Sequence, residues 1–210
     1  MKLVLFDWNG TLIDDMPIWY ESIKKIFAIH NAKPPTIEEY FRELETAKNY
    51  AEIYNKRGIV LGKDELDKIY QEEYKRYLPE IKLSPNVKKT ISALNKNGIV
   101  LGIVSTQLVP LFEPLINRFG IKELFKHIYL EIQQKSTTIL HICVQEKILP
   151  HECCYIGDAP SDIRNAKKAG VQALAYLNGY IPEELISAAN PDFTISRFQE
   201  LPKLIKNKKQ

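Results

Sequence analysis

The sequence predicts an α/β fold in which a parallel sheet is interrupted, close to its start, by a stretch of helices. Short apolar runs that end in polar residues alternate with helical patterns, which is typical of βαβ units with right-handed crossovers. The first run, Leu3–Phe6, is unbroken and stops at Asp7, as expected for a strand buried on both faces. We therefore expect residues 1–14 and 84–210 to form an α/β core. Residues 15–83, where glycine is scarce and apolar residues recur at helical spacing, should form a small helical domain.

The helical stretch divides into three or four amphipathic helices. Apolar residues recur at helical spacing in three segments, 18–27, 40–44 and 66–77. Pro34-Pro35 interrupts this pattern, and Thr36 followed by two early acids is typical of a helix start. The many aromatic residues of this stretch are best explained by packing within a small bundle.

The elements after residue 83 alternate between helix and strand. Asn97-Gly98 and Gly120 are typical helix ends, and the apolar runs that follow end in polar loops. In order, we expect a helix over 84–95, a strand over 99–104, a helix over 111–119, a strand over 127–132, a helix over 136–146, a strand over 153–156, a helix over 163–169, a strand over 171–177, a short strand over 192–195 and a final helix.

Composition excludes several classes of protein. The 210 residues are 45% hydrophobic and 26% charged, which is ordinary for a globular protein. Much of the net charge of +3 comes from the lysine-rich end, residues 203–210, and no basic stripe interleaved with aromatic residues indicates a nucleic-acid partner. No apolar run approaches the roughly 20 residues that span a membrane, and the start does not have the pattern of a signal peptide. Three cysteines without C-x-x-C spacing fit a reduced, cytoplasmic protein, and a monomer or homodimer is the default expectation.

Polar residues follow several of the predicted strands at the point where each strand ends. They are Asp7, Ser105 with Thr106, Lys135 and Asp158. Each has an ordinary structural explanation, since Asp opens turns, Ser caps helices and Lys is common on surfaces. A parallel sheet brings all of these ends to one edge, however, and their shared position favours function. Opposed carboxylates suit a cation such as Mg²⁺, and a lysine with hydroxyls suits a phosphate group.

These residues resemble the four motifs of the haloacid dehalogenase (HAD) superfamily, most of whose members are Mg²⁺-dependent phosphatases. The first motif, D-x-D-G-T, stands here as D-W-N-G-T from Asp7 to Thr11. The second is a hydroxyl residue that ends an apolar strand, matched by Ser105, and the third is a lysine, matched by Lys135. The fourth, G-D-x-x-x-D, spans Gly157–Asp162. The resemblance runs from Leu3 to about Leu177. It implies a Rossmann-like three-layer parallel-sheet core with a small helical cap, similar to phosphoglycolate-phosphatase-like members.

The resemblance also implies a role for each matching residue. Asp7 would attack phosphorus and form an aspartyl-phosphate. The Mg²⁺ cofactor would be held by the carboxylates of Asp7 and Asp158 and by the backbone carbonyl of Asn9. Asp162 would orient the motif lysine or a metal-bound water. The phosphoryl group of a small phosphorylated metabolite would be held by three residues, Ser105, Thr106 and Lys135.

The departure from the family is Asn9, because relatives with phosphatase activity usually carry Asp there as general acid and base. An amide has no proton that titrates near neutral pH. General acid–base catalysis typically contributes about 10²–10⁴-fold, so the resemblance implies a slowed phosphatase that favours acyl or aryl phosphates, whose leaving groups need no protonation. The alternative is a phosphotransferase or a non-hydrolytic phosphate-binding protein. A third hypothesis is that the Asn9-Gly10 bond deamidates, which would turn Asn9 into Asp.

Other phosphate-binding folds have weaker support in the sequence. Residues 58–64 read G-x-x-x-G-K-D, one residue short of a P-loop and without its hydroxyl, and no G-x-G-x-x-G follows a strand. Asp14 also matches a frequent acid of the resembled family. The sequence does not name the substrate, and the basic residues of the helical stretch that could contact an anion are Lys24, Arg42, Lys48 and Arg57.

Overall fold

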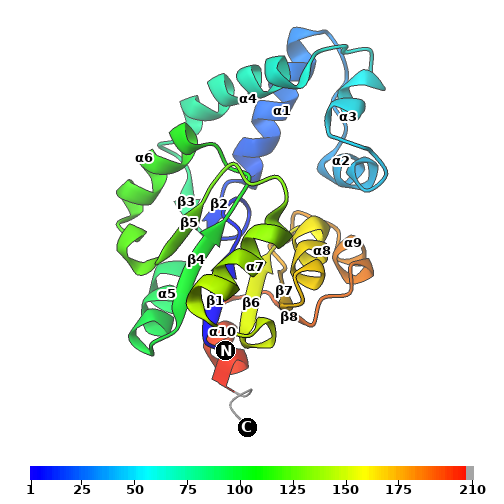
Figure 1. The fold of residues 1–210 in the computed structure, drawn as a ribbon. Helices are drawn as coiled ribbons and strands as arrows, with labels where there is room; N and C mark the ends of the chain where they lie inside the picture. The colour runs from blue at the N-terminus through cyan, green and yellow to red at the C-terminus, as the bar shows by residue number, and fades with distance from the viewer. Residues whose placement is uncertain (207–210) are drawn as a thin grey trace.

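The computed structural model describes residues 1–206, and a six-stranded parallel sheet lies at the centre of this part of the chain. The strand order is β5-β4-β1-β6-β7-β8 (Figure 1). β1 lies between β4 and β6 and pairs in parallel with both. The strands are β1 (Leu3–Phe6), β4 (Val100–Val104), β5 (His127–Tyr129), β6 (Cys153–Gly157), β7 (Gln172–Tyr176) and β8 (Phe193–Ile195). The predicted α/β class with a parallel sheet is confirmed.

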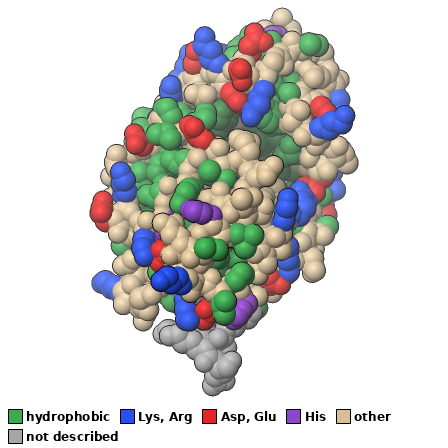
Figure 2. All heavy atoms as spheres, in the orientation of Figure 1, with side chains coloured by type: hydrophobic (Ala, Val, Ile, Leu, Met, Phe, Trp, Pro, Cys, Tyr) green, Lys and Arg blue, Asp and Glu red, His purple; other side chains and the backbone are tan. Residues whose placement is uncertain are grey.

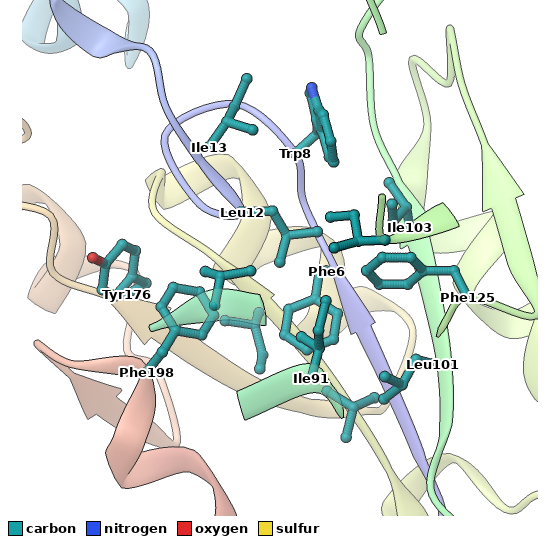
Figure 3. Close-up of a cluster of buried hydrophobic side chains, with 14 of the residues drawn as sticks. Phe6, Trp8, Leu12, Ile13, Ile91, Leu101, Ile103, Phe125, Tyr176 and Phe198 are labelled. Atoms are coloured by element: carbon teal, nitrogen blue, oxygen red, sulfur yellow. The ribbon is translucent and has the colours of Figure 1, made fainter. Parts of the chain in front are cut away.

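Helices cover both faces of this sheet and make the fold three-layered (Figure 1). Alternate residues of β1 point to opposite faces, as the pleat of a strand requires: Val4 and Phe6 pack in one hydrophobic cluster, Leu3 and Leu5 in another. Phe6 lies edge-on to Phe125, with ring centroids 6.3 Å apart (Figure 3). The first cluster includes residues of α5 (Val87–Lys96), α6 (Val109–Phe119) and α10 (Leu201–Lys206); the second includes residues of α7 (Lys135–Glu146), α8 (Pro160–Lys168) and α9 (Glu183–Ala188).

Residues 16–77, called the helical segment below, lie beyond the carboxyl edge of the sheet (Figure 1). The segment has a hydrophobic cluster of its own, in which the rings of Phe27 and Tyr54 stack with centroids 4.9 Å apart. The second helix begins after Thr36, as the sequence suggested, and a capping box joins Thr36 and Glu39 there. Its helices are α1 (Met16–Ile29), α2 (Ile37–Leu44), α3 (Ala51–Asn55) and α4 (Lys63–Tyr77). The domain boundaries at residues 15 and 83 stay a prediction.

Several boundaries differ from the expected ones. A short antiparallel pair, β2 (Ile13–Asp14) with β3 (Lys82–Leu83), joins the two ends of the helical insertion and was not predicted. The strand expected over 127–132 ends at Tyr129, and Glu131 has a φ of 60°, which a strand residue does not adopt. Short 3₁₀ helices lie at Lys122–Leu124, Pro150–Glu152 and Phe198–Glu200.

The surface carries acidic and basic side chains side by side. On the face shown in Figure 2 the two signs are interspersed, and neither forms a continuous stripe over the residues that are described. Residues 207–210 of the lysine-rich end lie outside the described residues. Within residues 1–206, no helix has the length and apolar character needed to cross a membrane.

Candidate active site

Four of the predicted site residues lie at the carboxyl edge of the sheet. Asp7 directly follows β1, Ser105 follows β4 and Asp158 follows β6. Lys135 is the first residue of α7, which comes after β5. Because these strands are neighbours in a parallel sheet, their carboxyl ends share one edge. The structure thus brings these residues together, and their chemical roles are proposals considered from the contacts below.

Lys135 lies at the centre of a buried cluster of charges. Its Nζ is 2.9 Å from Asp7 Oδ1 and 2.8 Å from Asp162 Oδ1, and all three residues are buried. Burial raises the pKa of Asp7 to about 6, against the opposing attraction of the Lys135 ammonium. Burial alone would lower the pKa of Lys135, but the charges of Asp162 and Asp7 outweigh it and raise that pKa well above its usual value. At neutral pH the cluster therefore holds an ionised Asp7 beside a fixed ammonium group.

Asp158 is held in place by two neutral donors. The Thr11 hydroxyl donates to Oδ1 at 2.9 Å, and Asn178 Nδ2 donates to Oδ2 at 2.8 Å. Asn178 Nδ2 also donates to the backbone oxygen of Gly10 at 2.9 Å. Gly10 has a φ of 66°, and a Cβ there would lie 2.3 Å from Asp158 Oδ2. At position 10, in the loop that follows β1, only glycine leaves room for the Asp158 carboxylate.

The three buried aspartates could hold a divalent metal ion. Asp7, Asp158 and Asp162 each offer a carboxylate oxygen, and these oxygens lie within 4.8 Å of one another. Burial, together with the charges of Asp162 and Asp7, raises the pKa of Asp158 well above its usual value. A cation would offset this repulsion, and Mg²⁺ commonly takes one or two protein carboxylates. Lys135 pairs with both Asp7 and Asp162, whereas the donors described above for Asp158 are neutral, so Asp158 is the carboxylate whose charge a metal ion would balance most directly.

Asn9 is bound by a further buried carboxylate, that of Asp15. Its Nδ2 donates to Asp15 Oδ2 at 2.6 Å and lies 3.3 Å from the Tyr74 hydroxyl. Asp15 also accepts from the Gly10 N–H at 2.7 Å and from the Tyr74 hydroxyl at 2.6 Å. Burial raises the pKa of Asp15, and these three donors lower it in part. The side chain at position 9 therefore has a fixed orientation, with its N–H groups directed toward Asp15.

The loop after β4 presents Thr106, which the sequence singled out, to the cavity, together with Gln107, which the sequence did not single out. Ser105 is fully buried, and its hydroxyl accepts from the backbone N–H of Gln107 at 3.2 Å. Thr106 and Gln107 line the cavity described below. The Gln107 Oε1 accepts from the Leu108 N–H at 3.0 Å, while its buried Nε2 has no protein partner. Gln107 is therefore an available donor at the cavity wall, which the sequence did not reveal.

A cavity of about 490 Å³ lies between the carboxyl edge of the sheet and the helical segment. Its floor includes Asp7, Asn9, Lys135 and Asp158. Residues of α1, α2 and α4 form the wall opposite the floor, among them Trp19, Phe41 and Tyr70. The reactive groups therefore face a cavity that the helical segment covers in part.

The structure adds residues that sequence reasoning missed. Asn178 follows β7 and could have been found by the same rule, since it is polar and ends a strand. Nothing in the sequence singled out Asp15. Its neighbour Asp14 matched a frequent acid of the family, but Asp14 is exposed and accepts from the Tyr180 hydroxyl at 3.2 Å. Tyr74 lies 59 residues further along the chain than Asp15, so no local pattern connects the two.

Three of the four cations suggested as anion contacts pair with glutamates. Arg42 pairs with Glu38 and Glu184, and Arg57 pairs with Glu43. Lys24 pairs with Glu21 at 2.6 Å. None of Lys24, Arg42, Lys48 and Arg57 lines the cavity described above.

Comparison with known proteins agrees with this fold. The haloacid dehalogenase-like hydrolase family matches residues 4–176. Phosphoglycolate phosphatase of Mannheimia succiniciproducens is 26% identical, over 97% of this chain and 98% of the relative. N-acetylmuramic acid 6-phosphate phosphatase of Pseudomonas aeruginosa is 26% identical, over 96% and 93%. The crystal structure of a haloacid dehalogenase-like protein of unknown function from Agrobacterium tumefaciens superposes with a TM-score of 0.80 at 21% identity, with complete coverage of both chains.

The family match spans most of the chain, and the chain therefore belongs to the haloacid dehalogenase-like hydrolases. The relatives just named are phosphatases that it matches along nearly their whole length. This confirms the predicted class of enzyme, a phosphatase of the HAD type that resembles the phosphoglycolate phosphatases. It also confirms the Rossmann-like character of the core.

Proposed function

We propose that this protein is a Mg²⁺-dependent phosphatase that hydrolyses a small phosphate monoester, or an acyl or aryl phosphate, through an aspartyl-phosphate on Asp7. The observation that carries the proposal is the buried line Asp7–Lys135–Asp162 beside Asp158, at the floor of a cavity that the helical segment covers in part. A carboxylate paired with an ammonium in such a place suits attack on a phosphoryl group.

In the first step an Asp7 oxygen bonds to phosphorus, and the bond from phosphorus to the leaving oxygen breaks. Lys135 holds the nucleophile through its 2.9 Å contact and is close enough to stabilise the charge of the transferred phosphoryl oxygens. Asp162 keeps the ammonium in place from the other side at 2.8 Å. In the second step water attacks the aspartyl-phosphate and restores the Asp7 carboxylate.

Mg²⁺, when bound, would supply positive charge that offsets the repulsion between an anionic nucleophile and an anionic substrate. The residues that would hold it are Asp7 and Asp158, with the backbone carbonyl of Asn9. Thr11 and Asn178 orient Asp158 through the hydrogen bonds described above. Thr106 lines the cavity and Ser105 supports its loop, so we propose that this loop contacts the phosphoryl group.

Asn9 determines which leaving groups this site expels well. Its amide cannot donate a proton to the leaving oxygen as a carboxylic acid would. Substrates whose leaving group is stable as an anion are slowed less by the lack of a proton donor. We therefore expect the rate to depend steeply on the pKa of the leaving group, and a flat dependence would contradict the proposed handicap.

The experiment that tests the proposal measures phosphate release from phenyl phosphate and acetyl phosphate, with and without Mg²⁺. Native protein should turn over only with Mg²⁺, and Asp7→Asn should be inactive with folding unchanged by circular dichroism. If native protein is inactive and phosphorylated Asp7 accumulates instead, transfer rather than hydrolysis is the function. Peptide mass mapping must find Asn9 intact, because deamidated protein would carry the family's usual acid.

A further inference from the structure

The wall of the active-site cavity opposite Asp7 is built from aromatic rings. Trp19 of α1 stacks on Phe41 of α2, with centroids 5.4 Å apart and planes at 27°. Trp19 also meets Tyr40 edge-on at 5.0 Å. All three residues line the cavity, as does Tyr70 of α4. Rings that already stack and meet at their edges form a rigid apolar surface for another planar group.

The charges around this wall do not favour a second anionic group on the substrate. Among the described residues, the basic side chains that line the cavity are Lys135, at the floor, and Lys63. Lys63 begins α4, and Asp67, one helical turn later, lines the cavity as well. The two charges have opposite signs, so this part of the wall offers no net positive charge to a carboxylate on the leaving group. The arginines of the helical segment pair with glutamates away from the cavity.

The chemistry of the floor selects in the same direction. Because residue 9 is an asparagine and not an acid, the leaving oxygen departs with its electron pair and without a proton. The leaving group must therefore be stable as an anion. A phenol has a pKa of about 10, which makes phenoxide a far better leaving group than an alkoxide. The aromatic wall therefore favours an uncharged ring on the leaving group. The residues at the floor of the cavity favour a leaving oxygen that is attached to such a ring.

From this agreement we propose that the substrate is a phosphate monoester of an uncharged aromatic hydroxyl compound, whose ring lies against Trp19, Tyr40 and Phe41. The proposal rests on the phosphatase function proposed above. The Asp7 oxygen bonds to phosphorus as the bond from phosphorus to the aryl oxygen breaks, and the phenoxide takes up a proton from water. Water then hydrolyses the aspartyl-phosphate to release inorganic phosphate.

The first test compares kcat/KM for phenyl phosphate, acetyl phosphate and phosphoglycolate with native protein and Mg²⁺. Acetyl phosphate has a good leaving group without a ring, and phosphoglycolate has a carboxylate. We expect phenyl phosphate to exceed phosphoglycolate by at least about tenfold, while acetyl phosphate, whose leaving group is the more stable anion, serves as the ring-free reference for the variant below. Equal or better turnover of phosphoglycolate would overturn the aryl proposal while leaving the phosphatase function intact.

A variant of the wall separates the ring contact from leaving-group chemistry. Phe41→Ala should lower the ratio of kcat/KM for phenyl phosphate to that for acetyl phosphate by about two- to tenfold, the range of one aromatic contact. Ile29→Ala is the matched control, because Ile29 is a 51% exposed apolar residue of α1 that does not line the cavity. An unchanged ratio in Phe41→Ala would contradict the assigned wall.

A binding measurement keeps the proposal testable if no substrate turns over. Phenylphosphonate and phosphonoacetate share a phosphonate that cannot be hydrolysed, and they differ in ring and carboxylate. With native protein and Mg²⁺, calorimetry should show phenylphosphonate binding at least about tenfold more tightly, and Phe41→Ala should reduce that difference. Tighter or equal binding of phosphonoacetate would overturn the aryl proposal, whereas absent turnover alone would count against the phosphatase function.

Discussion

At the scale of single residues, the amide of Asn9 fits its surroundings better than a second carboxylate would. Its Nδ2 lies 2.6 Å from the fully buried Asp15 carboxylate. An aspartate at position 9 would place two carboxylates at hydrogen-bond distance, and such a pair must share a proton. Asn9, which stands where the family motif has Asp, therefore pairs with Asp15 six residues later. The motif alone does not show this pairing.

We predict that Asn9→Asp makes stability strongly dependent on pH. The shared proton raises the carboxyl pKa in the folded protein above its unfolded value. The folded state is therefore favoured at acid pH, and it loses that advantage as the pH rises through the folded pKa. Between about pH 5 and about pH 8, the free energy of unfolding should fall by about 3 kcal/mol relative to native protein, as for an unpaired buried charge. Urea unfolding at both pH values measures this fall in the free energy of unfolding.

The control is the double variant Asn9→Asp with Asp15→Asn, which exchanges the acid and the amide. It keeps one carboxylate and one amide in contact and should recover most of the native pH dependence. The same variant carries an acid at position 9 and should turn over alkyl phosphates faster than native protein. If Asn9→Asp alone is as stable as native protein at about pH 8, the contact with Asp15 does not govern this site.

At the scale of elements, one residue of α4 connects the helical segment to the loop that follows β1. Tyr74 is fully buried, and its hydroxyl donates to Asp15 at 2.6 Å. Tyr74→Phe should lower the free energy of unfolding by about 1.5–3 kcal/mol, the usual range for a hydrogen bond to a charged group. It should also lower kcat, because Asp15 then holds Asn9 and Gly10 less firmly. Thermal unfolding and phosphate release measure the two effects.

The matched control for this substitution is Tyr20→Phe in α1. The Tyr20 hydroxyl donates to the backbone oxygen of Pro35 at 2.8 Å in a partly buried place, with no contact to Asp15. It should cost about 1 kcal/mol or less and leave kcat unchanged. Equal effects of the two substitutions would mean that Tyr74 only packs.

Sequence reasoning located the long elements well and the short ones poorly, for physical reasons. Helices such as α7 repeat their apolar residues over several turns, and buried strands such as β6 form unbroken apolar runs. The pair β2–β3 has two residues in each strand, too few for any periodicity. Its partners also lie on either side of the helical insertion, so only the folded chain reveals the pairing.

At the scale of the whole molecule, ion pairs on the surface join the helical segment to the helices beside the sheet. Arg164 of α8 donates to both carboxylate oxygens of Glu45 at 2.7 and 2.9 Å, and Arg42 of α2 pairs with Glu184 of α9. Exposed pairs of this kind contribute about 0–1 kcal/mol each. Their positions suit them to hold the two parts together over the cavity rather than to stabilise the fold.

We predict that Arg42→Gln combined with Arg164→Gln loosens this closure with little effect on folding. The midpoint of thermal unfolding should change by only a few degrees, in line with the small energy of exposed pairs. Acrylamide should quench tryptophan fluorescence more strongly, since Trp19 lines the cavity whereas Trp8 is fully buried. Quenching identical to that of native protein, at low and high salt, would show that the pairs do not hold the cavity closed.

The candidate site was predictable in part because topology gathers residues that are distant in the chain. Asp7, Lys135 and Asp158 are polar ends of apolar patterns, and a parallel sheet sends those ends to one edge. The wall of the cavity was not predictable. The spacing of Trp19 and Phe41 indicates that these residues face inward, but it does not distinguish a packed core from the lining of a cavity.

Metal binding should couple the site to the stability of the whole molecule in a pH-dependent way. Without metal, burial raises the pKa of Asp7 to about 6 and that of Asp158 well above its usual value, so protons compete with Mg²⁺ for these carboxylates. Mg²⁺ at a fixed concentration should therefore raise the unfolding midpoint more at about pH 8 than at about pH 5. Differential scanning fluorimetry measures the shift, and Asp158→Asn should abolish it at both pH values. A shift of equal size at both pH values would mean that these two carboxylates do not bind the ion.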